Sequence, residues 1–216
     1  MYHLFTTILT VASLLAAGMS PSAIAFEDLP LGPENNRPGL HGQHKMKMQT
    51  EGYRKQLVNY RLPEVTLLDS QDNPVNLAAL TDADRPLVIN FIFTTCPTIC
   101  PVLTSTFKGA EKGLMALNPS PLMISITIDP EHDTPGVLRE YRRRHHAGPE
   151  WMFLTGPMDS ILKVEKALDI YRGNKLSHEA VTLIKAPQKK GWLRLDGFTG
   201  TLALIKEYRE FVGAHN

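Results

Sequence analysis

LVINFIFTTCPTICP, residues 87–101, carries the clearest indication of the fold. Its first seven residues are apolar except for one asparagine, which indicates a strand covered on both faces. Cys96 and Cys100 follow, each with a proline directly after it, and proline favours the start of a helix. The stretch therefore predicts a central strand that leads into a helix. Its two cysteines would lie at the carboxyl edge of the sheet, where α/β proteins form their sites.

The start of this helix can be placed in two ways. If it begins at Pro97, Cys96 and Cys100 lie one turn apart on one face; if it begins at Pro101, both lie in the preceding loop. Either geometry brings the sulfurs together near the positive end of a helix, which lowers a thiol pKa and favours the thiolate that binds metals or attacks disulfides. We therefore expect a functional dithiol.

The rest of the chain alternates apolar runs with amphipathic stretches. From Leu62 onward we expect strand, helix and hairpin segments, with the hairpin and a last helix closing the domain. The strands are 65–68, 122–128 and 151–154, the helices 98–117, 134–145, 158–171 and 202–212, and the hairpin pairs 180–184 with 192–195. This order predicts an α/β fold, a thioredoxin-like three-layer sandwich with a central mixed β-sheet.

The overall composition bounds the function. The chain has 216 residues, 43% of them hydrophobic, which suffices for one sizeable core plus extensions. Its 23 basic and 22 acidic residues leave a formal net charge of +1. Such a balance gives no field that gathers nucleic acid or an anionic membrane surface, so we expect no nucleic-acid partner.

The amino-terminal segment has the sequence features expected of an export signal. Its first 25 residues contain no Lys, Arg, Asp or Glu, and they end in Ala23-Ile24-Ala25, a small-x-small cleavage pattern. We interpret residues 1–25 as a signal peptide, with an uncleaved membrane anchor as the alternative. Either predicts an exported, periplasmic protein, soluble or tethered to the inner membrane. Residues 26–60, rich in Gly, Pro, Asn, Gln and Lys, are expected to form a flexible arm, and residues 61–216 the domain.

Export affects how the two cysteines are interpreted. Outside the cytosol, thiols either become disulfides or are kept reduced for a purpose. A disulfide between Cys96 and Cys100 would close a very short loop and stabilise the fold only weakly. A redox-active or metal-binding dithiol is therefore favoured over a purely structural disulfide.

Several motifs together resemble those of one family. Cys-Pro-x-x-Cys-Pro following an apolar strand and Thr is matched at 91–101, Asp-Pro-x-x-Asp-Thr-Pro at 129–135, and Trp-x-Phe-Leu-Thr-Gly at 151–156. His178 corresponds to a distant histidine that precedes a strand. From about Leu62 to Val212, the chain resembles the Sco/SenC family, exported thioredoxin-fold proteins involved in copper delivery to cytochrome c oxidase.

The resemblance implies a site and partners. One copper ion per domain, as Cu(I) or Cu(II), would be held by Cys96, Cys100 and His178. Asp129, at the end of the neighbouring strand, would orient a ligand or contact a partner. The expected partners are a copper-receiving protein such as a cytochrome c oxidase subunit, and copper-donor or thiol-disulfide proteins. Independently, two thiolates and an imidazole suit copper, whereas zinc usually requires a fourth ligand.

The chain departs from the family pattern in its last third. The usual Val-Asp-His is Leu-Ser-His at 176–178, and the usual Asp-Pro-x-Gly turn is replaced at 186–191. These departures leave open which cuproenzyme receives the copper.

The alternative function is that of a thiol-disulfide oxidoreductase, an enzyme with the same fold and dithiol. Two features oppose this alternative. Three residues rather than two separate the cysteines, and no proline lies between Pro157 and Pro187, where thioredoxins place their cis-proline. A peroxidase is disfavoured because no arginine is placed to activate a peroxide. We therefore expect a metallochaperone and keep thiol-disulfide reductase activity as the open alternative.

The arm itself contains four copper donors, His41, His44, Met46 and Met48. They could catch copper weakly and pass it to the dithiol. The alternative is a solvated leader, since the lysines between the donors repel a cation.

Overall fold

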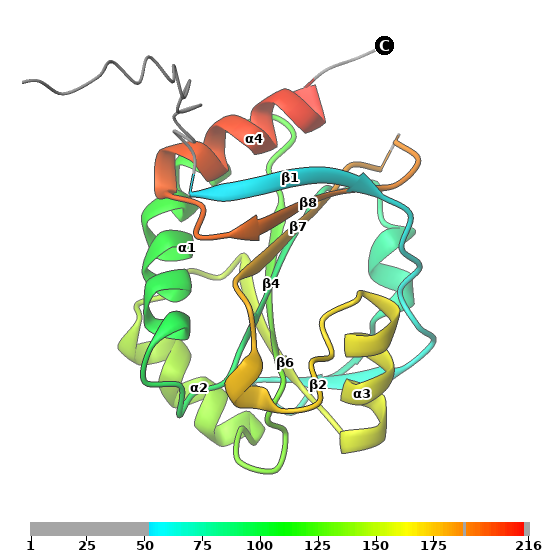
Figure 1. Cartoon of the computed structure of the whole chain (residues 1–216), viewed down its shortest axis with the longest axis vertical. Helices are drawn as coiled ribbons and strands as arrows, with labels where there is room; N and C mark the ends of the chain where they lie inside the picture. Colours follow the sequence, from blue (N-terminus) through cyan, green and yellow to red (C-terminus); the bar gives the residue numbers. More distant parts are fainter. Residues whose placement is uncertain (1–51, 188, 214–216) are drawn as a thin grey trace, which may run out of the picture. The chain divides into compact units, whose positions relative to one another are not determined.

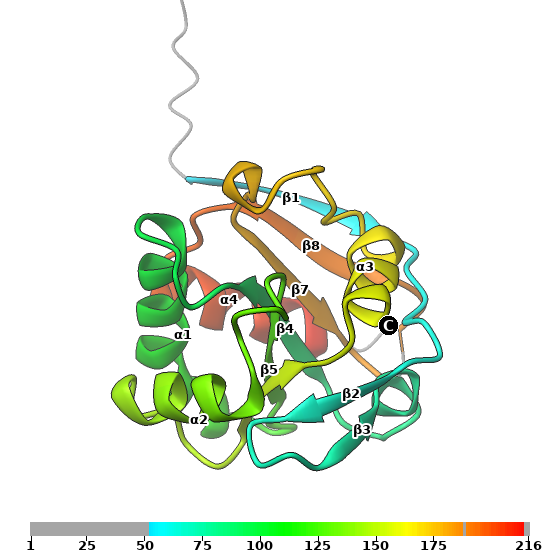
Figure 2. The same ribbon diagram turned by 90° about the horizontal axis from the view of Figure 1, so that it is seen from below.

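The computed structural model describes residues 52–187 and 189–213. Within this part of the chain, one eight-stranded sheet runs in the order β1-β8-β7-β4-β5-β6-β2-β3. β4, β5 and β6 are parallel, and the remaining pairs are antiparallel. Helices α1, α2 and α4 lie on one face of the sheet and α3 lies on the other (Figures 1 and 2). The predicted three-layer sandwich with a central mixed sheet is confirmed.

The elements have the following bounds. The strands are β1 Tyr53–Val58, β2 Thr66–Asp69, β3 Pro74–Asn76, β4 Leu87–Ile92, β5 Leu122–Thr127, β6 Trp151–Thr155, β7 Val181–Lys185 and β8 Trp192–Gly197. The α-helices are α1 Ile99–Met115, α2 Pro135–Arg144, α3 Met158–Ala167 and α4 Thr201–Gly213, and two 3-10 helices cover η1 Ala78–Thr81 and η2 Lys175–Ser177.

β4 is the central strand that its sequence predicts. All six of its residues are buried, and it pairs with β5 on one side and with β7 on the other. Both faces of the sheet are covered at β4, by the layer of α1, α2 and α4 on one side and by the layer of α3 on the other (Figures 1 and 2). This explains the almost continuous apolar run. The predicted hairpin is also present, as antiparallel β7 and β8.

Helix α2 begins where its cap predicts. The Thr134 hydroxyl accepts a hydrogen bond from the Val137 amide at 3.4 Å, and Pro135 occupies the first helical position. Helix α3 is shorter than predicted, because Asp169 has a φ of 52° that no right-handed helix accommodates. The amides of Ile170 and Tyr171 bond to the Glu165 carbonyl instead.

The structure corrects the extent of the arm. The expected flexible segment 26–60 is wrong at its carboxyl end, where Tyr53–Val58 forms β1 and pairs with β8. β1 is an edge strand whose middle residues are exposed and polar, so it lacks the apolar alternation that would reveal it in the sequence. The Tyr53 hydroxyl donates to the Glu207 carboxylate at 2.8 Å and fixes the strand against α4.

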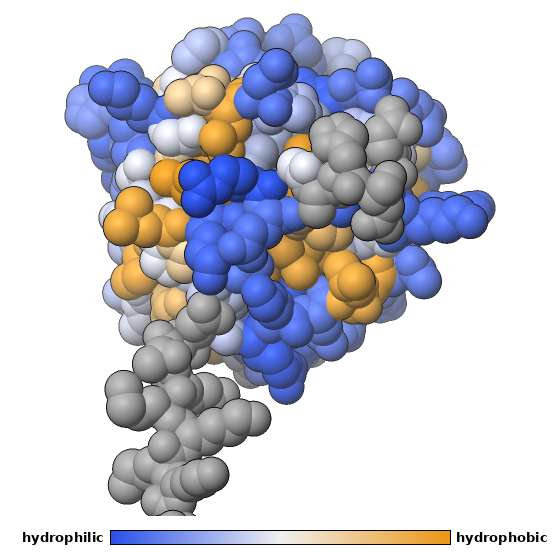
Figure 3. Space-filling view, turned by 90° about the horizontal axis from the view of Figure 1, so that it is seen from above, coloured by the Kyte–Doolittle hydropathy of each residue, from blue (hydrophilic) through white to orange (hydrophobic). Residues whose placement is uncertain are grey.

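The predicted signal peptide 1–25 and most of the arm, including His41, His44, Met46 and Met48, lie outside the described residues. Within the described residues, no helix combines the length and apolar character needed to cross a bilayer. On the face that carries α4 and β1, apolar side chains form small groups separated by hydrophilic ones (Figure 3). The described residues visible on this face form no continuous apolar surface.

Candidate functional site

The two cysteines lie between the end of β4 and the first turn of α1. Cys96 is in the connecting loop, where its amide bonds to the Phe93 carbonyl at 3.1 Å, and Cys100 is the second residue of the helix. The Cys100 amide donates to the Cys96 sulfur at 3.4 Å. Both cysteines are free and buried. The helix starts at Ile99, between the two predicted starts, and the sulfurs are brought together as either one required.

The two thiols differ in acidity. Burial alone would raise the pKa of Cys96, but backbone hydrogen bonds from Cys100 and Thr98 at the start of α1 lower it below its ordinary value. Burial dominates at Cys100, where it raises the pKa of the thiol well above its ordinary value. Cys96 is therefore the more easily ionised sulfur, and Cys100 stays a thiol until a metal or an oxidant removes its proton.

Asp133 holds the loop that carries Cys96. Its carboxylate is completely buried and accepts hydrogen bonds from the Thr94 amide at 3.0 Å and from the hydroxyls of Thr94 and Thr127. Asp133 is the second aspartate of the Asp-Pro-x-x-Asp-Thr-Pro motif. Asp133 lies in the loop after β5 and connects it to the loop after β4. The contact in that second loop is Thr94, two residues before Cys96. The spacing of Asp133 from Asp129 was visible in the sequence, but its contact with Thr94 was not.

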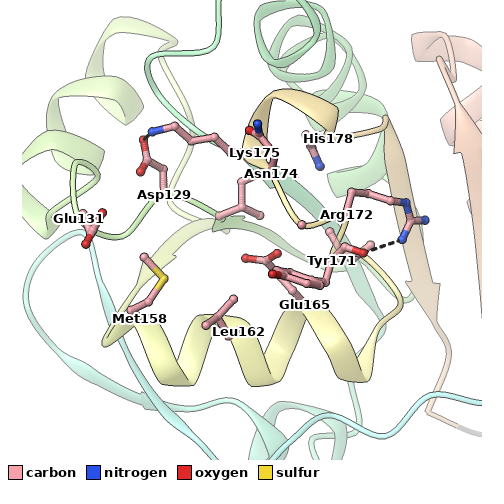
Figure 4. Close-up of a pocket in the computed structure, with 13 residues that line it drawn as sticks. Asp129, Glu131, Met158, Leu162, Glu165, Tyr171, Arg172, Asn174, Lys175 and His178 are labelled. Atoms are coloured by element: carbon pink, nitrogen blue, oxygen red, sulfur yellow. Dashed lines mark hydrogen bonds and ion pairs between the residues drawn. The ribbon is translucent and has the colours of Figure 1, made fainter.

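Asp129 faces the same edge of the sheet, as its position after β5 predicts. Its buried carboxylate pairs with Lys175 at 2.5 Å. The Lys175 ammonium also lies 5.8 Å from the centre of the Phe93 ring, at the end of the cysteine-bearing strand. Since Lys175 belongs to η2, which leads directly into His178, Asp129 anchors the segment that carries the histidine (Figure 4).

His178 lies just before β7, next to the cysteine strand, as predicted. Its Nε2 atom lies 3.1 Å from the Phe91 carbonyl oxygen. A carbonyl only accepts, so this bond requires the proton on Nε2 and leaves the Nδ1 lone pair available. Burial lowers the pKa of His178 and favours the neutral ring that a metal requires.

The ring and the two sulfurs are not yet assembled as ligands. Within the described residues, no group of three His, Cys, Asp or Glu side chains is placed to hold a metal ion. His178 and Ile99, which neighbours Cys100, line one cavity of about 450 Å³, so space separates the histidine from the start of α1. The donor types fit copper, but the imidazole and the sulfurs must come closer together than they lie here to form a three-ligand site.

A second cavity, of about 260 Å³, lies on the other side of His178, between η2 and α3 (Figure 4). Asp129, Glu131 and Glu165 line it together with Met158 and Tyr171. This pocket was not predicted from the sequence. The available signal was Glu165, which occupies an inward position on α3 next to Val164 and one turn from Ile161.

The fold and the dithiol together define a class. A central strand that ends at two cysteines, followed by a helix whose amino terminus acidifies one of them, is the arrangement of thioredoxin-like dithiol proteins. A model of the SCO1/SenC family matches residues 59–191, which is more than half of the chain. The chain therefore belongs to the SCO1/SenC family.

Known relatives agree with this assignment. A SCO1 protein homolog of Bacillus subtilis is 33% identical over 103 residues, which cover 47% of this chain and 52% of the relative. The chain thus matches about half the length of its curated relatives. The solved structure of BsSco, a member of the Sco family of cytochrome c oxidase assembly proteins in which a disulfide switch was identified, is 25% identical. It has a TM-score of 0.62 and covers 75% of this chain and 99% of its own.

Copper-loaded yeast Sco1 supports the fold. Its structure is 23% identical, with a TM-score of 0.59, and covers 71% of this chain and 96% of its own. These likenesses confirm the thioredoxin-like fold that the sequence predicts.

Proposed function

We propose that this protein is an exported copper chaperone that binds one copper ion through Cys96, Cys100 and His178 and delivers it to a cuproenzyme such as cytochrome c oxidase. The observation that carries the proposal is the buried pair of free thiols at the start of α1, with Cys96 acidified by the helix amides. A thiolate is the form that binds copper. The yeast relative in the same family has been solved with copper bound.

The neutral, buried imidazole supplies the third ligand in this proposal. Two sulfurs alone can hold Cu(I) linearly, whereas Cu(II) gains more from a nitrogen donor. The bond between Nε2 of His178 and the Phe91 carbonyl leaves Nδ1 as the atom that would bind the metal. Turning the ring costs this single hydrogen bond, which is worth about 0.5–1.5 kcal/mol.

A thiol-disulfide oxidoreductase is the second candidate. The opposite pKa shifts of the two thiols favour it, because an acidic Cys96 can attack a disulfide while Cys100 remains protonated. In that reaction, Cys96 would form a mixed disulfide with a partner and Cys100 would displace the partner's thiol, leaving a Cys96–Cys100 disulfide.

Metal titration of the reduced full chain separates the two candidates. A chaperone binds one equivalent of copper and loses it on Cys96→Ser or Cys100→Ser. An oxidoreductase that does not handle copper shows disulfide exchange without stoichiometric copper binding. Export is supported by the charge-free first 25 residues, and cell fractionation tests it.

A further inference from the structure

Glu165 is a buried carboxyl group that lacks the partners found at similar sites in this chain. Two other buried glutamates are satisfied: Glu111 pairs with Lys108 at 2.7 Å and accepts from the Gly148 amide, and Glu207 pairs with Lys55 at 3.0 Å. Glu165 is only 7% exposed, yet within the described residues its carboxyl group meets no hydrogen-bond donor and has only the Coulombic attraction of Lys166. Without a donor in the protein, the carboxyl oxygens depend on whatever fills the cavity that they face.

The Glu165 carboxyl group points into the cavity of about 260 Å³ between α3 and η2 (Figure 4). This volume lies below the roughly 300–1,000 Å³ of pockets that hold drug-sized ligands, so it suits a single side chain better than a whole cofactor. Apolar side chains can cover the stem of such a side chain. They are Met158, Leu162, Ile170 and the ring of Tyr171.

The uncompensated charge of the cavity is negative. Its two basic residues are already paired, Lys175 with Asp129, and Arg172 with Glu179 at 3.0 Å. Glu131 forms no ion pair within the described residues, and Glu165 forms none either. A metal ion does not fit this set, because no three suitable ligands converge in the described part of the chain. An organic cation with several N–H donors does.

We propose that this pocket, lined by Glu165, Glu131 and Tyr171, binds an arginine side chain of a partner protein. A guanidinium can donate to a carboxylate in a bidentate manner and stack on an aromatic ring, which a lysine ammonium does less well. His178 lines the same pocket, so an arginine bound there brings the partner to the histidine side of the dithiol. That docking role rests on the proposed copper-chaperone function, whereas guanidinium binding does not.

The test uses the metal-free, reduced full chain and a small probe, N-acetyl-L-arginine methylamide. The probe is titrated while the side-chain carboxyl carbon of Glu165 is followed by NMR, and the backbone amides of α3 are followed in wild type and in both variants so that their Kd values can be compared. The uncharged citrulline analogue serves as the ligand control. Glu165→Gln is the test variant, and Glu140→Gln, an exposed carboxylate on α2, is the matched control.

The arginine probe should shift the Glu165 signal with a millimolar Kd, because only one side chain is engaged. The citrulline analogue and the Glu165→Gln variant should each bind at least fivefold more weakly, and Glu140→Gln should match wild type. An unshifted Glu165 signal, equal binding of the citrulline analogue, or unchanged binding by Glu165→Gln would each overturn the pocket. No copper is present, so these results are independent of whether the chain is a copper chaperone.

Discussion

The buried carboxylate of Asp133 accepts a hydrogen bond from the amide of Thr94 at 3.0 Å, across 39 residues of sequence. This bond joins the Asp-Pro-x-x-Asp-Thr-Pro motif to the loop that presents Cys96. The same carboxylate also accepts from the Thr127 hydroxyl at 2.6 Å. The cysteine motif and the Asp-Pro-x-x-Asp-Thr-Pro motif are therefore joined in one site. Asp133 positions the loop that carries Cys96 and forms no hydrogen bond with either cysteine in the described part of the chain.

Asp133→Asn should destabilise the reduced, metal-free protein by about 2–4 kcal/mol, because hydrogen bonds to a charged group are each worth about 1.5–3 kcal/mol and an amide nitrogen cannot accept them. Urea unfolding measures the change. The exposed Asp82→Asn variant should stay within about 0.5 kcal/mol of wild type. A fully stable Asp133→Asn variant with unchanged Cys96 reactivity would show that the connection does not hold the loop.

Cys96 should react with iodoacetamide well before Cys100 in the folded protein. The pKa of Cys96 is lowered and that of Cys100 is raised, so at any given pH a larger fraction of Cys96 than of Cys100 is thiolate. The Cys96 thiolate contributes stability above the ordinary thiol pKa, and this contribution is lost as the pH falls through the lower folded-state pKa. Mass spectrometry of single-cysteine variants gives the two rate profiles. Faster alkylation of Cys100 would contradict the assignment.

Glu165→Gln should stabilise the protein at pH 8. Burial raises the pKa of Glu165 to about 7, so ionisation costs stability as the pH rises from the unfolded-state pKa of 4.5, and the full penalty applies above the folded value. The gain should be on the order of 1–3 kcal/mol at pH 8 and should vanish near pH 4. Other charged or titratable groups around the pocket are Asp129, Glu131, Lys166, Arg172, Lys175 and His178.

Urea unfolding across this pH range provides the measurement for Glu165. The Glu140→Gln variant provides the baseline, since that carboxylate is exposed and its pKa is lowered rather than raised. Parallel stability curves for wild type and Glu165→Gln would mean that the carboxyl group is solvated in the folded chain.

Lys175→Met should loosen the segment that carries His178, because it leaves the buried Asp129 carboxylate without its cation. Lys175 is half-exposed, so the expected loss is about 1–2 kcal/mol rather than the larger value of a fully buried pair. Hydrogen exchange of residues 174–178 should accelerate. Asp129→Asn combined with Lys175→Met should recover part of the loss, and the exposed Lys163→Met variant should show no effect.

His178→Ala should weaken Cu(II) binding much more than Cu(I) binding, with a difference of at least tenfold, since two thiolates alone can hold Cu(I). The apo fold should change little beyond the loss of a side chain whose hydrogen bond is made to the Phe91 carbonyl. Competition titrations with each copper state measure the split. If His178→Ala weakened Cu(I) and Cu(II) binding equally and also lowered the Tm of the metal-free protein strongly, His178 would be a structural residue.

The local pattern was sufficient to predict most of the fold. The apolar run of β4, the Thr134 cap of α2 and the turn-separated hairpin are signals within one element, and each predicted its element correctly. β1 was missed because an exposed edge strand needs no apolar alternation; its partner β8 lies more than 130 residues away along the chain. Such pairing depends on tertiary structure, which no local window contains.

Within the candidate site, the sequence predicted the cysteine pair and the edge of the sheet that Asp129 faces. It did not predict how the side chains connect across the site. Asp133 reaches Thr94, and Asp129 reaches Lys175, through contacts between loops that are distant in sequence. The pocket at Glu165 was missed for the same reason. The sequence shows a glutamate at an inward helix position, but only the structure shows that this glutamate faces a cavity and has no hydrogen-bond donor among the described residues.

The most direct test of the copper-chaperone account is a copper titration of the reduced full chain against its oxidised form and against Cys96→Ser, Cys100→Ser and His178→Ala. We expect one tightly bound copper per reduced chain, and loss of that copper on oxidation or on removal of either cysteine. Without His178, Cu(I) should be retained and Cu(II) binding should be weakened. Oxidised protein that holds Cu(I) as tightly as reduced protein would contradict the copper-chaperone account.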